Sequence, residues 1–183
     1  MFFYNVCKDF NAALGGSNGQ IKQPFSFKRK FTVLLSFEFH VVLFYRFYSS
    51  LYDKSSMKYL GFILYQLSKF LFKCDIHPGA RIEAGLHLVH GFNVIVGADA
   101  IIGENVCLFD GVSIGKKNVG TNDGMPIIKN NVIIGTGAKV LGNIIIEEGV
   151  IIGANSVVIK SIVEKHVSVA GVPARIIRYG ANQ

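Results

Sequence analysis

The sequence predicts a mainly β protein, a parallel β-helix of six-residue repeats preceded by an α-helical hairpin. Two observations support this prediction. From Ile76 onward an aliphatic residue recurs every six positions, whereas residues 31–72 carry apolar or aromatic side chains at most positions around one polar break. The lead positions of the repeat are Ile76, Ile82, Leu88, Val96, Ile102, Leu108, Ile114, Ile134, Val140, Ile146, Ile152 and Val158.

The repeat has two inward-facing residues per unit, which fits neither an amphipathic helix nor an alternating strand. A small or aliphatic residue follows most lead positions after four residues, and glycine often comes directly after the lead residue. This pattern is typical of short strands separated by tight turns, because glycine supplies the backbone freedom that such turns need. Three units close one turn of a parallel β-helix, and stacked turns bury the aliphatic columns.

The chain changes character near Asp75, which divides it into residues 1–74 and 75–183. Within the first part, residues 31–72 read as two antiparallel helices joined by the polar segment DKSSMK at 53–58. The first 25 residues read as a loose leader, punctuated by the sequence GGSNGQ. We therefore expect a leader and helical hairpin first, followed by a β-helix with a C-terminal tail.

Positive charge is concentrated in the N-terminal part. The whole chain has 19 Lys and Arg against 12 Asp and Glu, a formal charge of +7. Residues 1–74 hold 10 of the basic and 3 of the acidic residues, which gives +7, and the remaining 9 basic and 9 acidic residues cancel. Such asymmetry is typical of proteins that contact nucleic acid or an anionic membrane. We expect no nucleic-acid partner. The aromatic side chains of residues 31–72 are expected chiefly to pack as a hairpin, and peripheral membrane contact through residues 28–72 stays open beside this role.

The apolar segment 31–52 raises the question of a transmembrane span. Glu38, His40 and Arg46 interrupt it, and a true span tolerates few such groups. The start of the chain lacks the pattern of a signal peptide, and the three cysteines are too widely spaced for a metal site or a disulfide framework. We therefore expect a cytoplasmic protein that can reach the inner face of the plasma membrane.

The six-residue period fails at two places. The spacing from Leu88 to Val96 is eight, and His90 lies in this insertion, followed by glycine. The spacing from Ile114 to Ile134 is twenty, and the segment GKKNVGTNDGMPII interrupts the pattern there. In a solenoid such insertions leave the stacked core as loops, which are the usual place for function.

Five motifs carry a resemblance to a known family: DIHPGARI, VHGFNVIVG, GTGAKVLGNI, VIIGANSVVIK and AGVPARII. With them the sequence resembles the hexapeptide-repeat acyltransferases, and more closely their serine acetyltransferase branch. The resemblance implies a left-handed β-helix prism, a homotrimer, and acetyl-CoA bound in a groove between neighbouring prisms. It also implies an enzyme in which a histidine acts as general base on a hydroxyl acceptor, with no metal.

Carried over by position, the general base is His90, and its carboxylate partner is Asp75 of the DIHP motif. Asp110, one coil further along, is the alternative partner, and His87 is a candidate contact to the acceptor. A histidine side chain titrates near neutral pH, which suits proton removal from an alcohol, and a carboxylate favours the imidazolium that forms. The cofactor positions that the resemblance implies are Gly115, Thr136, Gly137, Ala138, Ala154, Lys160, Arg175 and Arg178.

The sequence departs from the serine-specific enzymes at the acceptor site. It has Val89 where they have an aspartate before the catalytic histidine, and Gly124-Met125-Pro126 where their loop has an Arg-His pair before the proline. Without these groups free serine would forgo several charge-assisted hydrogen bonds, each of which contributes about 1.5–3 kcal/mol. On this ground free serine is a poor candidate for the acceptor. The sequence also resembles short relatives of the same layout, with an HHG-like histidine motif, that occur in bacterial capsule and exopolysaccharide gene clusters. This resemblance implies that the acceptor is a sugar hydroxyl of a cell-surface polysaccharide or its precursor.

Three alternatives stay open at the level of sequence. The first is a serine O-acetyltransferase in shortened form. The second is a γ-class carbonic anhydrase, which shares the scaffold but binds zinc through three histidines from adjoining subunits, a spacing that His77, His87 and His90 do not show. The third is a non-catalytic trimeric scaffold.

Overall fold

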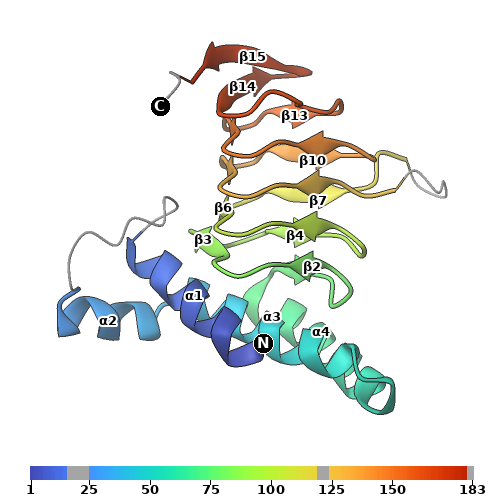
Figure 1. Cartoon of the computed structure of the whole chain (residues 1–183). Helices are drawn as coiled ribbons and strands as arrows, with labels where there is room; N and C mark the ends of the chain where they lie inside the picture. The colour runs from blue at the N-terminus through green and yellow to red at the C-terminus, as the bar shows by residue number, and fades with distance from the viewer. Residues whose placement is uncertain (16–24, 119–123, 181–183) are drawn as a thin grey trace.

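The computed structural model describes residues 1–15, 25–118 and 124–180. Figure 1 shows a column of stacked coils with the N-terminal helices packed across its lower end and the C-terminal strands at its upper end. Three sheets run along the column, and successive coils contribute a strand to each of them. The strands pair in parallel except for the last two strands of the third sheet, which pair antiparallel. The predicted β-helix preceded by helices is confirmed.

The strands are short, and their spatial order within each sheet is as follows. The first sheet contains β1 (Asp75–Ile76), β4 (Ile95–Val96), β7 (Ser113–Gly115), β10 (Lys139–Leu141) and β13 (Val157–Val158). The second contains β11 (Ile145–Ile146), β8 (Ile127–Ile128), β5 (Ile101–Ile102) and β2 (Arg81–Ile82). The third contains β15 (Ala174–Tyr179), β14 (Val167–Gly171), β12 (Ile151–Ile152), β9 (Ile133–Ile134), β6 (Cys107–Phe109) and β3 (His87–Val89).

The lead residues of the repeat form the core of the column. Every predicted lead position is buried, and Ile128, inside the second break, occupies an equivalent buried position on β8. Parallel pairing keeps these residues in register, as in Ile76 opposite Val96 and Val96 opposite Ile114. Stacking therefore buries continuous aliphatic columns, and this burial is the main favourable free energy of the β-helix.

The helices comprise α1 (Phe2–Gly15), α2 (Phe27–Leu34), α3 (Phe37–Tyr52), the short 3₁₀ helix η1 (Ser55–Met57) and α4 (Lys58–Phe72). Helices α3 and α4 form the predicted hairpin, with Ser36 capping the first turn of α3 by accepting a hydrogen bond from the Phe39 N–H. Gly61 allows the two helices to approach closely, because a Cβ there would lie 2.7 Å from the Tyr52 backbone nitrogen.

The prediction of a loose leader is wrong for residues 2–15, which form α1. This helix packs on α3 and on β3 and buries Asp9 and Leu14. Non-local contacts hold it there: Leu14 is buried, the Phe10 ring packs on Phe39, and Asp9 forms the ion pair described below. Most of the segment GGSNGQ lies outside the described residues.

No single described helix is long and apolar enough to cross a membrane. The bent pair Phe27–Leu34 and Phe37–Tyr52 passes the test of length and composition together, with a 58° bend. Six side chains of α3 are buried inside the protein, so this helix uses much of its apolar surface for packing.

Helix α3 satisfies backbone groups at the open end of the column. Its hydroxyls donate to carbonyl oxygens of the first coil: Tyr45 to Ala80 at 2.8 Å, Tyr48 to Ile76 at 2.6 Å and Ser49 to Pro78 at 3.0 Å. Burial raises the pKa of Tyr45 to about 12, so its hydroxyl stays a proton donor at any physiological pH. A solenoid end left bare would expose these carbonyl groups as an unpaired edge.

A buried ion pair between α1 and α3 completes this contact. The Arg46 guanidinium bonds the Asp9 carboxylate at 2.9 Å and 3.1 Å, and it also donates to the carbonyl oxygens of Ile82 and Glu83. Asp9 in turn accepts the N–H groups of Gly85 and Leu86, at 2.8 Å and 2.9 Å. All the donors and acceptors around this pair are matched, which is the condition for burying charge.

Replacing Asp9 with alanine should lower the free energy of unfolding by about 3–5 kcal/mol, because Arg46 would stay buried without its counter-ion. Chemical denaturation at a fixed protein concentration measures the change. Asp53→Ala is the control, since Asp53 is exposed at the end of α3 and its loss should cost less than about 0.5 kcal/mol. A loss below about 1 kcal/mol for Asp9→Ala would show that the ion pair does not hold α1 in place.

Candidate active site

His90 lies where the chain leaves the first coil at the end of β3. Its backbone adopts a left-handed conformation, with φ of 52°, and its side chain is exposed. The Phe92 N–H donates back to the His90 carbonyl at 2.6 Å, which closes a tight bend. A Cβ at Gly91 would lie 3.0 Å from the Leu88 side chain, a tight contact that favours glycine at this bend. The two-residue excess in the repeat therefore turns the imidazole outward, away from the core.

The loop that carries His90 is anchored to the helices and to the chain before β1. The Phe92 ring stacks on Phe37 at the start of α3, with centroids 4.5 Å apart. The Asn93 N–H donates to the Lys73 carbonyl at 3.1 Å, and the Cys74 thiol donates to the Gly91 carbonyl. These contacts hold the loop against the start of α3 and the segment before β1.

Asp75, the predicted partner of His90, lies on the strand beside this loop, and its N–H donates to the Val94 carbonyl at 2.8 Å. Its carboxylate accepts a hydrogen bond from the Tyr65 hydroxyl and forms an ion pair with Lys69 at 2.8 Å. Burial and the carboxylate raise the pKa of Tyr65, so the hydroxyl remains a donor. Within the described part of the chain, the structure shows no hydrogen bond between Asp75 and His90.

The other candidates near the first coil have packing contacts. His77 accepts the Gly79 N–H at 3.0 Å and lies against the Tyr52 and Tyr65 rings, and burial lowers its pKa. Burial also lowers the pKa of His87 on β3. Both imidazoles are therefore neutral at physiological pH.

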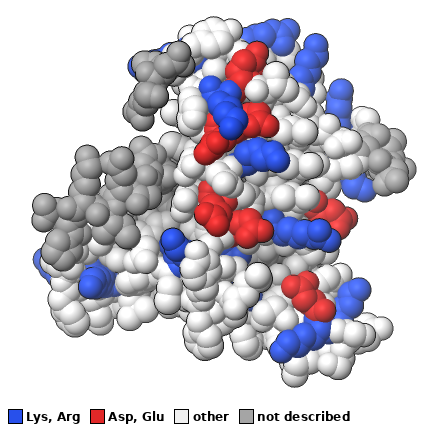
Figure 2. Space-filling view, viewed as in Figure 1, with Lys and Arg blue, Asp and Glu red and all other residues white. Residues whose placement is uncertain are grey.

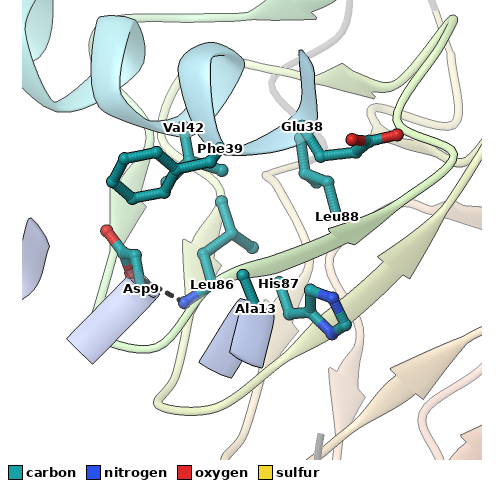
Figure 3. Close-up of a pocket in the computed structure, with 8 residues that line it drawn as sticks. All are labelled: Asp9, Ala13, Glu38, Phe39, Val42, Leu86, His87 and Leu88. Carbon is teal, nitrogen blue, oxygen red and sulfur yellow. Dashed lines mark hydrogen bonds between the residues drawn. The ribbon is translucent and has the colours of Figure 1, made fainter. Parts of the chain in front are cut away.

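A small hollow lies beside His87 between α1, α3 and β3. Figure 3 shows its lining, with Asp9 bonded to the Leu86 backbone nitrogen. The lining residues are Asp9, Ala13, Glu38, Phe39, Val42, Leu86, His87 and Leu88. Its empty volume of about 190 Å³ includes open solvent, so the enclosed space is smaller still. The hollow is too small for a nucleotide cofactor.

The predicted cofactor positions lie further up the column. A Cβ at Gly115, at the end of β7, would meet no atom within 4 Å, so packing within this chain does not require glycine there. Gly137 does have a structural role, because its backbone φ of +71° lies in the left-handed region that favours glycine. The Ala138 side chain is buried in the core, which leaves only its backbone for a ligand.

Asp110, the alternative carboxylate, is tied to the same turn. Its side chain accepts the Thr136 hydroxyl at 2.9 Å, and its carbonyl accepts the Gly137 N–H at 2.8 Å. The structure therefore joins Asp110 to two predicted cofactor positions.

The basic candidates lie near the C-terminal end. Lys160 and Ala154 are exposed at turns, and Arg175 and Arg178 are exposed on β15. Strands β3 and β15 are at opposite edges of the third sheet, five strand steps apart, or about 24 Å. A ligand that contacted both His90 and these arginines would have to be long and lie along the column. Acetyl-CoA has this form, with the thioester at one end and nucleotide phosphates at the other.

The described residues contain no candidate metal site. Among them, no three or more His, Cys, Asp or Glu side chains are grouped so that they could hold a metal ion.

Known proteins share this arrangement. The family model of the bacterial transferase hexapeptide (six repeats) matches residues 125–160. The structure of serine acetyltransferase from Brucella abortus in complex with coenzyme A superimposes with a TM-score of 0.84 and 35% identity, over 99% of this chain and 70% of that one. The chain belongs to the hexapeptide-repeat acyltransferases, in their serine acetyltransferase-like branch.

Other serine acetyltransferases show a similar level of similarity to this chain. Serine acetyltransferase from Neisseria gonorrhoeae in complex with serine gives a TM-score of 0.81 and 32% identity, over 95% of this chain and 68% of that one. Serine acetyltransferase from Synechococcus elongatus is 43% identical over 115 residues, which are 63% of this chain and 47% of the relative. The chain thus spans about half the length of the curated relatives it matches.

These comparisons contradict the prediction of a sugar acceptor in polysaccharide biosynthesis, because the similar proteins are serine acetyltransferases. The prediction rested on charged groups that Val89 and Gly124-Met125-Pro126 lack. In the structure Met125 is buried and packs against Gly97, and Pro126 accepts a backbone hydrogen bond from Ile101. Packing therefore also explains the residue at Met125, so the missing charge there is a weak indicator of the acceptor.

The residues that hold the candidate site are not recognisable from the sequence pattern. Phe37 fixes the His90 loop, and Tyr65 and Lys69 hold Asp75. The sequence did contain one indication that another segment packs on α3. An arginine within an apolar helix, Arg46, requires either a buried acidic partner or a polar surface. Asp9 supplies that partner from 37 residues away.

Thiol reactivity should report how firmly the His90 loop is held. Cys7 is exposed, whereas burial raises the pKa of Cys107 from 9.0 to about 12 and also raises that of Cys74. At pH 8 this lowers the thiolate fraction of Cys107 about a thousandfold. In the folded protein, Ellman's reagent should therefore label Cys7 rapidly and the other two only after denaturation.

The same assay tests the aromatic anchor. Phe37→Ala removes the ring under Phe92 and should speed the labelling of Cys74, whose thiol bonds the loop carbonyl. Phe47→Ala, at an exposed position of α3, is the control. Equal Cys74 labelling rates in the two variants would mean that the stacked pair does not hold the loop.

Proposed function

We propose that the protein transfers the acetyl group of acetyl-CoA to the hydroxyl of serine, with His90 as the general base. The similarity to serine acetyltransferases with bound coenzyme A and bound serine supports the reaction and both substrates. The observation that carries the role of His90 is its placement: an exposed imidazole on an anchored bend, at the insertion in the repeat.

In this reaction the serine hydroxyl oxygen attacks the thioester carbonyl, a C–O bond forms and the C–S bond breaks. His90 accepts the hydroxyl proton and passes it to the departing CoA sulfur. Asp75 is the proposed carboxylate that favours the imidazolium, because its strand lies beside the His90 loop and Tyr65 and Lys69 hold its carboxylate.

Acetyl-CoA is proposed to lie along the column, with its thioester near His90 and its phosphates near the basic end. The open space beside Gly115 and the exposed Lys160, Arg175 and Arg178 fit such a ligand. A homotrimer, in which a neighbouring prism closes the groove, and a cytoplasmic location are part of the same proposal. Analytical ultracentrifugation tests the trimer.

His90→Ala should lower kcat for acetyl transfer to L-serine by about 10²–10⁴-fold, because the general base is lost. Free CoA release and O-acetylserine formation, followed together, measure the rate. His40→Ala is the control, since His40 is an exposed helix residue whose Nδ1 lies 2.7 Å from the Ser36 carbonyl. Unchanged kcat in a folded His90→Ala protein would overturn the proposed base, and no acetylation of L-serine by the native protein would overturn the proposed substrate.

Arg175→Ala with Arg178→Ala should raise KM for acetyl-CoA about three- to thirtyfold and leave kcat nearly unchanged. Exposed ion pairs each contribute up to about 1 kcal/mol, and these two residues would act only on the phosphates of the cofactor. Arg81→Ala, exposed on β2 in another sheet, is the matched control. A fall in kcat with unchanged KM would place the arginines elsewhere in the reaction.

A further inference from the structure

Helix α4 has two apolar faces, and α3 covers only one of them. The inner face includes Gly61, Tyr65 and Ser68, which are buried against the rest of the protein. The outer face has the spacing of a continuous helical stripe, and its side chains are 44–70% exposed. Its residues are Leu60, Ile63, Leu67, Phe70 and Leu71. A soluble helix normally places polar side chains on such a face.

The charged residues of α4 lie at its ends. Lys58 begins the helix and Lys73 caps its end, while Lys69 in the last turn pairs with Asp75; the helix contains no Asp or Glu. The Lys58 ammonium lies 5.0 Å from the Tyr52 ring and that of Lys73 lies 4.7 Å from the Phe70 ring. A helix that lies flat in a membrane interface has this pattern, because lysines at its ends reach the headgroups while the stripe faces the acyl chains.

Helix α2 repeats the pattern at the same end of the molecule. None of its residues is buried, and Phe27 and Phe31 stack on each other one turn apart while 84% and 52% exposed. Lys28, Arg29 and Lys30 lie between them in the sequence. In Figure 2 the helical end appears largely white with blue patches and little red.

Charge decides what can cover this surface. Between residues 25 and 74 the acidic residues are Glu38 and Asp53, against eight basic residues, of which Arg46 is neutralised by Asp9. A second copy of α4 packed on this face would bring lysines to lysines with no carboxylate on the helix to pair with them, which disfavours an α4–α4 contact between copies. An anionic lipid surface can satisfy both features together: its headgroups pair with the cations, and its acyl chains bury the apolar stripe.

We propose that the outer face of α4, together with α2, is a docking surface for an anionic phospholipid membrane. The surface is at the end of the column farthest from the C-terminal strands (Figure 1). In the proposed trimer, whose prisms stand side by side, a threefold axis along the columns presents three such surfaces in one plane. Three weak contacts to one bilayer then act together. This last step rests on the proposed trimer, whereas the surface itself belongs to one chain.

Vesicle flotation with the full chain tests the proposal. The protein should float with phosphatidylglycerol-containing vesicles, bind pure phosphatidylcholine vesicles at least tenfold more weakly, and be released from the anionic vesicles as salt rises. Equal binding to both vesicle types, or no binding to either, would overturn the proposal. Acetyl transfer to L-serine in solution is measured separately, so a failure of either proposal is recognised without the other.

Substitutions then locate the surface. Ile63→Glu should weaken binding at least tenfold, because it places a carboxylate in the apolar stripe. Lys28→Gln, Arg29→Gln and Lys30→Gln together should weaken it about a hundredfold, since each cation near an anionic surface contributes about fivefold. Val163→Glu is the matched control, an exposed apolar residue near the opposite end of the column.

Two outcomes would overturn the assignment of this surface. One is vesicle binding by Ile63→Glu equal to that by Val163→Glu. The other is a fall in the molecular mass of the lipid-free protein on Ile63→Glu, measured by light scattering, since that result would show that a second copy of the chain covers α4.

Discussion

The structure depends on the satisfaction of backbone hydrogen-bonding groups at the first coil of the β-helix. Inside the column each coil bonds to the next, but the first coil has no preceding neighbour. Helix α3 donates hydrogen bonds from Tyr45, Tyr48 and Arg46 to carbonyl groups of the first coil. Asp9 of α1 accepts hydrogen bonds from two N–H groups of the same coil. Unsatisfied polar groups at a buried edge are costly, so the helices are a structural part of the β-helix.

The same helices set the geometry of the candidate site. Phe37 at the start of α3 holds the loop that turns His90 outward, and Tyr65 and Lys69 of α4 hold Asp75 on the first strand. A change in how the helices pack on the column would therefore move both proposed catalytic groups. The basic candidates for cofactor binding depend instead on the far end, where β15 turns back on β14.

The acceptor prediction shows how little a few missing side chains reveal about a substrate. The charged groups absent at Val89 and Met125 suggested that free serine was a poor candidate for the acceptor and left it as the alternative. The overall similarity to serine acetyltransferases contradicts that inference. A local substitution changes the free energy of one interaction, whereas sequence identity distributed over the whole β-helix reflects the geometry of the fold as a unit.

The sequence alone determined the β-helix, the two interruptions of its period and the position of His90 in the first one, because a six-residue period is a local property that each unit displays by itself. Only the tertiary structure decided that residues 2–15 form a docked helix, that Phe37 stacks on Phe92, and that Tyr65 and Lys69 hold Asp75. It also decided which face of α4 stays uncovered, since both faces are apolar in the sequence. These features depend on partners 6 to 77 residues apart in the chain. A pattern along one segment contains no information about which other segment will pack against it.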